Sequence, residues 1–379
     1  MISISKLLCD ASAPGDKLRY GGTLRPIVVW NSTQRCNLRC LHCYAQAQNT
    51  IFPGELSTEE GKAFIQDLAD FGVPALLFSG GEPLLRNDIL ELASWASKLG
   101  IRAVFSTNGT LIKDGLAERI VEVGLAEVGI SIDGLGPIND RFRGHKGAFE
   151  AALQGIRRLV ALGQRVSLRL TITKHNFGEI PAIFDLVERE NIDRVCFYHL
   201  TYAGRASNMK DEDLSAQQTR AVVDLIFDRT LDLHRRGLNK EVLTVDNHAD
   251  SVYLYFRVKR DQPSKADAVL ELLRRNGGNN SGIRIGAVDN MGNVHPDQFW
   301  WHYSLGNVRQ RKFSDIWTDT SDPLLQGLRN RKPLFKGRCG KCQYLDLCNG
   351  NLRVRAEAVY GDIWADDPAC YLTDKEIGL

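Results

Sequence analysis

Short apolar runs alternate with amphipathic segments along most of this chain. The amphipathic segments repeat apolar residues every three or four positions, as at Phe64, Leu68 and Phe71, which is typical of helices. Ser57 and Glu60 form a capping-box pattern where this first helix would begin. The apolar runs have the length of buried strands and lie at residues 27–31, 75–79, 103–106, 127–132, 166–173 and 194–200.

Strands that alternate with helices form parallel sheets with right-handed crossovers. The pattern therefore predicts an α/β fold, a partial (β/α)6 TIM-type barrel, with its active residues at the C-terminal ends of the strands. The alternation ends near residue 250, and a Gly- and Asn-rich stretch follows at 277–282. We predict four segments: an N-terminal extension (1–24), a barrel (25–250), a linker or helical connection (251–282) and a cysteine-rich C-terminal domain (283–379).

Composition and charge place few demands on the partners of this protein. The chain is 43% hydrophobic and 25% charged, with a net charge of +2, so neither nucleic acid nor a membrane is required as a partner. No apolar run is long enough to span a bilayer, and the first residues do not form a secretory signal. We therefore expect a cytoplasmic protein, in which disulfides would be unusual.

Three cysteines after the first predicted strand carry the strongest chemical signal. Cys36, Cys40 and Cys43 have the short, uneven spacing that lets one loop aim several thiolates at one inorganic core. Three sulfurs are one fewer than the four irons of a cubane cluster, so one iron would stay open. The alternatives are part of a disulfide framework, or a zinc site in which His42 supplies a fourth ligand.

The motifs after the next strands favour the cluster. Residues 79–83 are Ser-Gly-Gly-Glu-Pro, residues 106–109 are Ser-Thr-Asn-Gly, and residues 131–134 are Ser-Ile-Asp-Gly. Together with the cysteine loop, they make the chain resemble the radical S-adenosylmethionine (SAM) enzymes from about residue 25 to its end. This resemblance implies a 4Fe–4S cluster on the three cysteines, with SAM bound to the open iron and cleaved to a 5′-deoxyadenosyl radical.

The same resemblance implies that the Gly-Gly-Glu-Pro segment lies along the methionine part of SAM. Gly80 and Gly81 would let bare backbone approach the ligand. Glu82 would be a helper or a structural cap.

Four polar residues on the later strands are further candidates for SAM contacts. Ser131 and Asp133 alternate along their strand, so both are expected to face SAM, unless they form a solvated strand end. Asn108 follows the third strand. Arg169 lies inside an apolar run and therefore needs a partner, either the SAM carboxylate or an internal acid.

A second group of cysteines lies near the end of the chain, at Cys339, Cys342, Cys348 and Cys370. Their spacing can ligate a second 4Fe–4S cluster completely, or a structural zinc ion. The segments 292–296, 305–308 and 313–317 resemble recurring elements of the SPASM-type extension found on many radical SAM enzymes. That resemblance favours an iron–sulfur domain.

Full SPASM domains carry two auxiliary clusters, and this chain departs from their pattern. The cysteine expected after residue 296 is Asp297, and one expected after Cys348 is Leu352. We therefore expect a single auxiliary cluster with four cysteine ligands, which serves electron transfer or structure. Of the other cysteines, Cys196 is expected to be a buried apolar residue, and Cys9 lies in an extension expected to be mobile.

Local sequences narrow the family further. The segments 52–57, 202–205, 295–302 and 320–323 resemble the radical SAM enzymes of heme d1 biosynthesis. This resemblance implies a tetrapyrrole substrate, didecarboxysiroheme, that loses two propionate side chains after hydrogen abstraction by the 5′-deoxyadenosyl radical. It also implies a flavodoxin or ferredoxin as reductant.

Two residues near the end of the sixth predicted strand are candidates for substrate contacts. Arg205 could pair with a propionate bidentately, and His199 could ligate the substrate iron or act as an acid or base. A purely structural histidine is the alternative.

Other functions stay open from the sequence. They are a heme-pathway decarboxylase, which could act on an iron coproporphyrin, a SPASM-type peptide maturase and a non-enzymatic iron–sulfur or zinc scaffold. A maturase would usually need an N-terminal peptide-binding domain, for which the residues before the barrel are too few. The complete set of SAM motifs argues against a scaffold.

Overall fold

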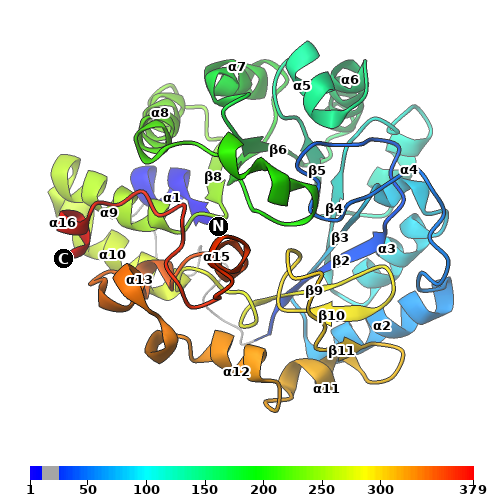
Figure 1. The fold of residues 1–379 in the computed structure, drawn as a ribbon. Coiled ribbons are helices and arrows are strands. Elements are labelled where there is room, and N and C mark those ends of the chain that lie inside the picture. The colour runs from blue at the N-terminus through cyan, green and yellow to red at the C-terminus, as the bar shows by residue number, and fades with distance from the viewer. Residues whose placement is uncertain (11–24) are drawn as a thin grey trace.

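The computed structural model describes residues 1–10 and 25–379. In this part of the chain, eleven strands form one sheet in the order β1-β8-β7-β6-β5-β4-β3-β2-β9-β10-β11. Neighbouring strands from β2 to β8 are parallel, and helices cover the outer face of the curved sheet (Figure 1). The predicted partial α/β barrel is therefore confirmed.

The six predicted strands are all present, with bounds that differ by at most two residues. They are β2 (Ile27–Thr33), β3 (Ala75–Gly80), β4 (Arg102–Thr107), β5 (Glu127–Ser131), β6 (Val166–Ile172) and β7 (Arg194–His199). The helices that connect the parallel strands are α2 (Thr58–Phe71), α3 (Ile89–Lys98), α4 (Leu116–Glu122), α5 (Pro137–Arg143), α6 (Ala148–Ala161), α7 (Ile180–Arg189) and α8 (Ala216–Arg235).

Helix α2 begins where the sequence predicts. Ser57 accepts a hydrogen bond from the backbone N–H of Glu60, and the Glu60 side chain accepts one from the N–H of Ser57. Phe64 and Leu68 on this helix are buried in the main apolar core, which also contains Trp30. The cap and the apolar stripe together fix the helix against the outer face of the sheet.

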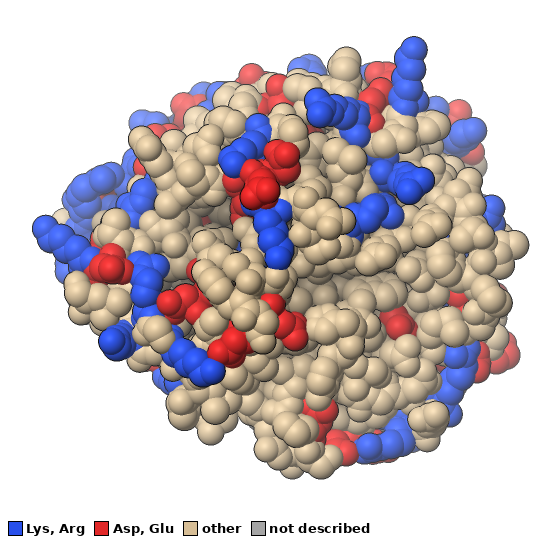
Figure 2. Space-filling model, in the orientation of Figure 1, with Lys and Arg blue, Asp and Glu red and all other residues tan. Residues whose placement is uncertain are grey.

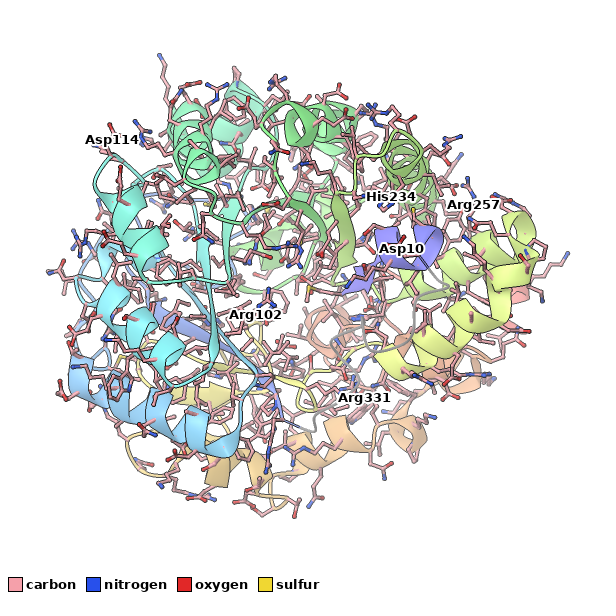
Figure 3. The ribbon with its side chains drawn as sticks, turned by 180° about the vertical axis from the view of Figure 1, so that it is seen from behind. Asp10, Arg102, Asp114, His234, Arg257 and Arg331 are labelled. Atoms are coloured by element: carbon pink, nitrogen blue, oxygen red, sulfur yellow. The ribbon has the colours of Figure 1, made fainter. Side chains whose placement is uncertain are left out.

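The sheet has an edge that the sequence pattern did not reveal. A further parallel strand, β8 (Glu241–Val245), follows α8, and the short strand β1 (Ile2–Ser3) pairs antiparallel with it. Helix α1 (Ile4–Cys9) then packs beside α8, as the rear view shows near Asp10 (Figure 3). Cys9 is therefore half-buried in a helix, not in a mobile extension. The rest of the predicted extension, residues 11–24, lies outside the described residues.

The sheet also continues into the C-terminal part of the chain. Strand β9 (Ile285–Val288) pairs in parallel with β2, and β10 (Asn293–His295) and β11 (Gly306–Asn307) follow it antiparallel. The predicted connection consists mainly of two helices, α9 (Ala249–Asp261) and α10 (Ala266–Asn276). The remaining helices are α11 (Phe313–Thr318), α12 (Pro323–Arg329), α13 (Gly337–Lys341), α14 (Leu345–Cys348), α15 (Arg353–Tyr360) and α16 (Asp374–Ile377). Among the described residues, no helix has both the length and the apolar character needed to cross a membrane.

Candidate active site and auxiliary cysteine site

One cavity lies where the C-terminal ends of the parallel strands meet. Figure 2 shows the corresponding face of the molecule, hollowed near its centre. Most of the site residues expected from the sequence line this cavity: Cys36, Cys40, Cys43, Gly80, Gly81, Asn108, Ser131, Arg169, His199 and Arg205. Glu82 and Asp133 do not line it.

The three cysteines of the first motif are free thiols, and the sulfur of each one accepts a hydrogen bond from an N–H group. The backbone N–H of Leu38 lies 3.4 Å from the Cys36 sulfur, and that of Ala47 lies 3.4 Å from the Cys43 sulfur. Burial raises the pKa of the Cys36 thiol to about 12, so a thiolate there needs a cation beside it. Iron would supply that charge, because a metal-bound thiol gives up its proton.

The third thiol receives its hydrogen bond from a side chain. Nη1 of Arg143, at the end of α5, lies 3.7 Å from the Cys40 sulfur. Nη2 of the same guanidinium lies 2.6 Å from Asp133, which is fully buried. A carboxylate therefore holds a cation against one of the cysteines.

Asp133 accordingly lies behind the cavity, while Ser131 faces into it. The sequence predicts that both share one face, but β5 ends at Ser131, so strand alternation does not extend to Asp133. One oxygen of Asp133 accepts from the backbone N–H of Thr171, and the other pairs with Arg143. In this structure Asp133 supports the cysteine loop through Arg143 and does not line the cavity.

Gly80 and Gly81 allow the end of β3 to pass against the cysteine loop. Gly80 has φ of +131°, and a Cβ there would lie 2.2 Å from the carbonyl oxygen of Thr33. A Cβ on Gly81 would lie 2.2 Å from the carbonyl oxygen of Arg35. Any side chain at either position would push the two segments apart.

Glu82 is a structural cap, which is one of the two roles that the sequence suggests. Its side chain is fully buried and accepts hydrogen bonds from the Thr107 hydroxyl at 2.7 Å and the Asn108 N–H at 2.8 Å. Burial raises its pKa to about 6, although these hydrogen bonds oppose the shift. Glu82 thereby fixes the loop that places Asn108 at the cavity.

Arg169 is the most available cation in the cavity. Its nearest acidic oxygen, in Glu127, is 4.0 Å from Nη2, and its buried Nε has no hydrogen-bond partner. Gly129 on the neighbouring strand makes room for it, since a Cβ there would lie 2.2 Å from Nε. The guanidinium is therefore packed in place but weakly paired, as a site for an anionic ligand group requires.

His199 and Arg205 are both engaged with protein groups. Nε2 of His199 lies 3.0 Å from Asp250; burial alone would lower the pKa of this histidine, but the carboxylate outweighs burial and raises it. Arg205 donates from Nε to the carbonyl of Cys40 and from Nη1 to that of Ala47. Only Nη2 of Arg205 is left without a partner, so the bidentate contact expected from the sequence is not available in this arrangement.

Sequence reasoning missed several residues that line the same cavity, among them Tyr44 and Asp246. Tyr44 donates to Asn31 and contacts Ser79. Asp246, directly after β8, has φ of +66° and a pKa that burial raises to about 7. Gln298 and Phe299 reach the same cavity from the C-terminal part and lie in the segment 295–302, on which the sequence resemblance partly rests.

A second, smaller cavity contains the four C-terminal cysteines. Cys339, Cys342, Cys348 and Cys370 all line it and are free thiols. Burial raises the pKa of Cys339 to about 11, and the Tyr344 N–H lies 3.4 Å from the Cys342 sulfur. Within residues 1–10 and 25–379, no three His, Cys, Asp or Glu side chains converge closely enough to hold a single metal ion. A cubane cluster needs a wider arrangement, because each thiolate binds a different corner of the core.

The two departures from the SPASM pattern have structural roles here. Asp297 is buried, pairs with the hydroxyl of Ser281 and accepts from the N–H of Phe299 at 2.8 Å. It therefore shapes the loop that carries Phe299 to the first cavity, at the C-terminal ends of the parallel strands, which we call the large cavity. Leu352 is buried, and its N–H donates to Asp367.

Comparisons with known proteins agree with this geometry. A family model described as the Radical SAM superfamily matches residues 30–187. The chain is 58% identical over its full length to the Fe-coproporphyrin III synthase of Methanosarcina barkeri, of which 99% is covered. It is 44% identical to the pre-heme d1 synthase of Dinoroseobacter shibae, over 94% of this chain and 89% of that one.

The fold is also similar to a solved structure, that of Streptococcus suis SuiB bound to S-adenosylmethionine. The TM-score is 0.72 at 19% identity, over 94% of this chain and 80% of the other.

Proposed function

The chain belongs to the radical SAM superfamily, and from this premise we propose that it removes carboxylate-bearing side chains from an iron tetrapyrrole. The observation that carries the proposal is 58% identity, over the full length, to an Fe-coproporphyrin III synthase. The 44% identity to a pre-heme d1 synthase points to the same class of substrate.

The residues of the cavity suit an anionic macrocycle. Arg169 has no close carboxylate, and Nη2 of Arg205 is unpartnered, so each can donate to a carboxylate of the substrate. Phe299 and Tyr44 offer aromatic surface at the same cavity, with ring centroids 5.5 Å apart. His199 lines the same cavity and is held by Asp250, which supports a role in proton exchange or in contact with the substrate iron.

Cys36, Cys40 and Cys43 would hold the SAM-binding 4Fe–4S cluster. When bound there, the reduced cluster and SAM supply the 5′-deoxyadenosyl radical that abstracts hydrogen from the substrate. The chain's own residues bind SAM at Gly80, Gly81, Asn108 and Ser131, and orient the cysteine loop through Arg143 and Arg205. A flavodoxin or ferredoxin in the cytoplasm would supply the electron.

The C-terminal part is proposed to be a SPASM-like domain with one auxiliary 4Fe–4S cluster on its four cysteines. Their common cavity and buried thiols support this proposal. Complete cysteine ligation would leave no open iron, so the cluster would serve electron transfer or structure.

Two reactions on didecarboxysiroheme are candidates. A coproporphyrin-type product keeps its propionates and has lost acetate side chains, whereas a heme d1 precursor has lost two propionates. The higher identity to the Fe-coproporphyrin III synthase favours the first. The heme d1 reaction is the second candidate, supported by the other relative and by the sequence resemblance.

The test is anaerobic incubation of the reconstituted, reduced protein with SAM and didecarboxysiroheme, followed by mass spectrometry. We expect deoxyadenosine together with a tetrapyrrole that has lost acetate masses stepwise. Loss of propionate masses would instead support the heme d1 reaction. Deoxyadenosine with an unchanged tetrapyrrole would contradict both reactions and direct the search to coproporphyrin and then to peptide substrates.

A further inference from the structure

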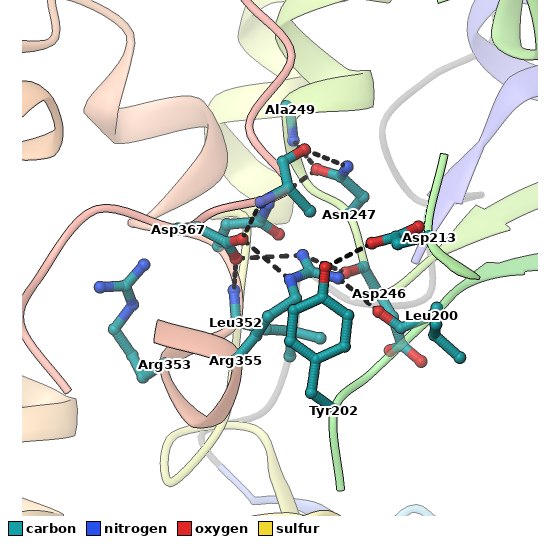
Figure 4. Close-up of polar contacts among 12 residues, drawn as sticks. Leu200, Tyr202, Asp213, Asp246, Asn247, Ala249, Leu352, Arg353, Arg355 and Asp367 are labelled. Atoms are coloured by element: carbon teal, nitrogen blue, oxygen red, sulfur yellow. Dashed lines mark hydrogen bonds and ion pairs between the residues drawn. The ribbon is translucent and has the colours of Figure 1, made fainter. Parts of the chain in front are cut away.

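The large cavity and the auxiliary cysteine cavity are joined by one buried ion pair, Arg355 with Asp367 (Figure 4). Asp367 lines the cysteine cavity, whereas Leu200 and Asp246 line the large cavity. Arg355 lies between them on α15, and neither side chain of the pair is exposed to solvent.

The guanidinium of Arg355 contacts both sides. Nε and Nη2 donate to the two oxygens of Asp367, at 2.8 and 3.0 Å. Nη1 donates to the carbonyl of Leu200 at 2.9 Å, just beyond β7, and Nη2 to that of Asp246 at 3.0 Å, just beyond β8. The position of Arg355 therefore sets two backbone carbonyls at the wall of the large cavity.

On the other side, Asp367 organises the loop that carries the last cysteine. Its side chain accepts from the N–H groups of Leu352 and Ala369, and its carbonyl accepts from the N–H of Cys370. Asn247, next to Asp246, donates to the carbonyl of Ala369 at 2.9 Å. The cysteine loop and the end of β8 are thus linked twice.

We propose that Arg355 is a positioning residue that couples binding of the auxiliary cluster in the cysteine cavity to tetrapyrrole binding in the large cavity. If the loop around Cys370 loosens, Asp367 moves away and leaves a buried, unpaired cation, which is strongly unfavourable. Arg355 then has to move, and the carbonyls of Leu200 and Asp246 lose their donor. The inference rests on the proposed function, because the ligand of the large cavity is taken to be a tetrapyrrole.

Coupling between two sites is reciprocal, so the substrate must stabilise the auxiliary cluster in turn. The test uses the full-length chain with Cys36, Cys40 and Cys43 replaced by Ala, so that sulfide release in the presence of an iron chelator reports the auxiliary cluster alone. The probe is didecarboxysiroheme, which contains no sulfide, and its binding is measured separately by absorbance. We expect the tetrapyrrole to slow sulfide release about fivefold or more.

The quantity compared is the ratio of the sulfide-release rates without and with tetrapyrrole. The variant Arg355→Met should bring this ratio close to one, and Arg355→Lys should restore part of it. Arg353→Met is the matched control, because Arg353 is equally buried on the same helix but donates only to carbonyls of Gly350, Ile363 and Ala365. Figure 4 shows it turned away from the bridge. This control should keep the ratio of the parent protein.

Two results would overturn the inference: tetrapyrrole that binds the parent without slowing sulfide release, or an Arg355→Met variant that keeps the full ratio. If Arg355→Met does not fold, Asp367→Asn replaces it, since it removes the charge and keeps the shape. Absence of tetrapyrrole binding to the parent would instead refute the proposed function, and the coupling with it.

Discussion

At the scale of single residues, the cysteine loop is shaped by neighbours that the motif does not contain. Arg143 donates to the Cys40 sulfur and is held by the buried Asp133. Hydrogen bonds and charges at the sulfurs are among the features that set the reduction potential of an iron–sulfur cluster. A cation fixed at one thiolate stabilises the more negative, reduced state of the cluster.

Replacing Arg143 by Met should therefore make the reconstituted SAM-binding cluster harder to reduce, and Arg143→Lys should have a smaller effect. The measurement is a redox titration followed by electron paramagnetic resonance. Arg157→Met is the control, because Arg157 pairs with Glu190 on the outer surface. An unchanged potential in Arg143→Met would show that the 3.7 Å contact does not influence the cluster.

The sequence predicted the residues whose role depends on spacing, and not those whose role depends on where an element ends. Both cysteine sets follow from their spacing, and each set lines one cavity. Asp133 lies behind the cavity because β5 stops two residues earlier. Arg205 binds the carbonyls of Cys40 and Ala47, a contact across more than 150 residues that no local pattern contains.

At the scale of elements, helix α2 shows how a local signal is reinforced from far away. Its capping box follows from Ser57 and Glu60. The structure adds Arg309, which lies beyond β11 and donates to both oxygens of Glu60, at 2.6 and 3.1 Å. One carboxylate thus caps a barrel helix and binds the C-terminal part.

Glu60→Gln should lower the free energy of unfolding by about 1 kcal/mol or less at neutral pH, because the pair is partly exposed. The hydrogen bonds from Arg309 and from the Ser57 N–H lower the pKa of Glu60 to about 2. A lowered carboxyl pKa contributes stability above the unfolded value, and this contribution disappears as the pH falls toward the folded value. The difference between wild type and variant should therefore shrink from about pH 4 downward.

Urea unfolding followed by circular dichroism at several pH values measures this difference. Glu59→Gln is the matched control, because Glu59 lies next to Glu60 but its side chain is 84% exposed and pairs only with Lys62. A pH-independent difference for Glu60→Gln would contradict the assignment.

The strands that the sequence missed lack a pattern of their own. Strand β1 has two residues, and β8 has five that begin with Glu241. Both are specified by the partner they pair with, as in the register of Ile2 with Thr244. The six predicted runs were recognisable because each is an apolar run flanked by helical patterns.

At the scale of the whole molecule, the predicted boundary near residue 283 does not divide the sheet. Strand β9 completes the edge of β2, and Gln298 and Phe299 reach the barrel cavity. A break in sequence character reports a change in local pattern, whereas the sheet is held by pairing across that break. The barrel and the C-terminal part therefore share one sheet and line one cavity.

A fragment of residues 1–282 should accordingly aggregate, because the edge of β2 would be left unpaired. Size-exclusion chromatography with light scattering measures this outcome. Removal of residues 374–379 is the control, since α16 lies outside the sheet. A monodisperse fragment as heat-stable as the full chain would show that the barrel does not need β9.

The pairing of β2 with β9 also has a consequence for biosynthesis. Ile27 pairs with Ile285, so the partner of the first barrel strand leaves the ribosome more than 250 residues later. At translation rates of about 5–20 residues per second, this interval is on the order of tens of seconds. During that time the cysteine loop after β2 is already synthesised while its flanking strand lacks a neighbour. The sheet edge beside the cysteine loop can therefore close only when the chain is three-quarters synthesised.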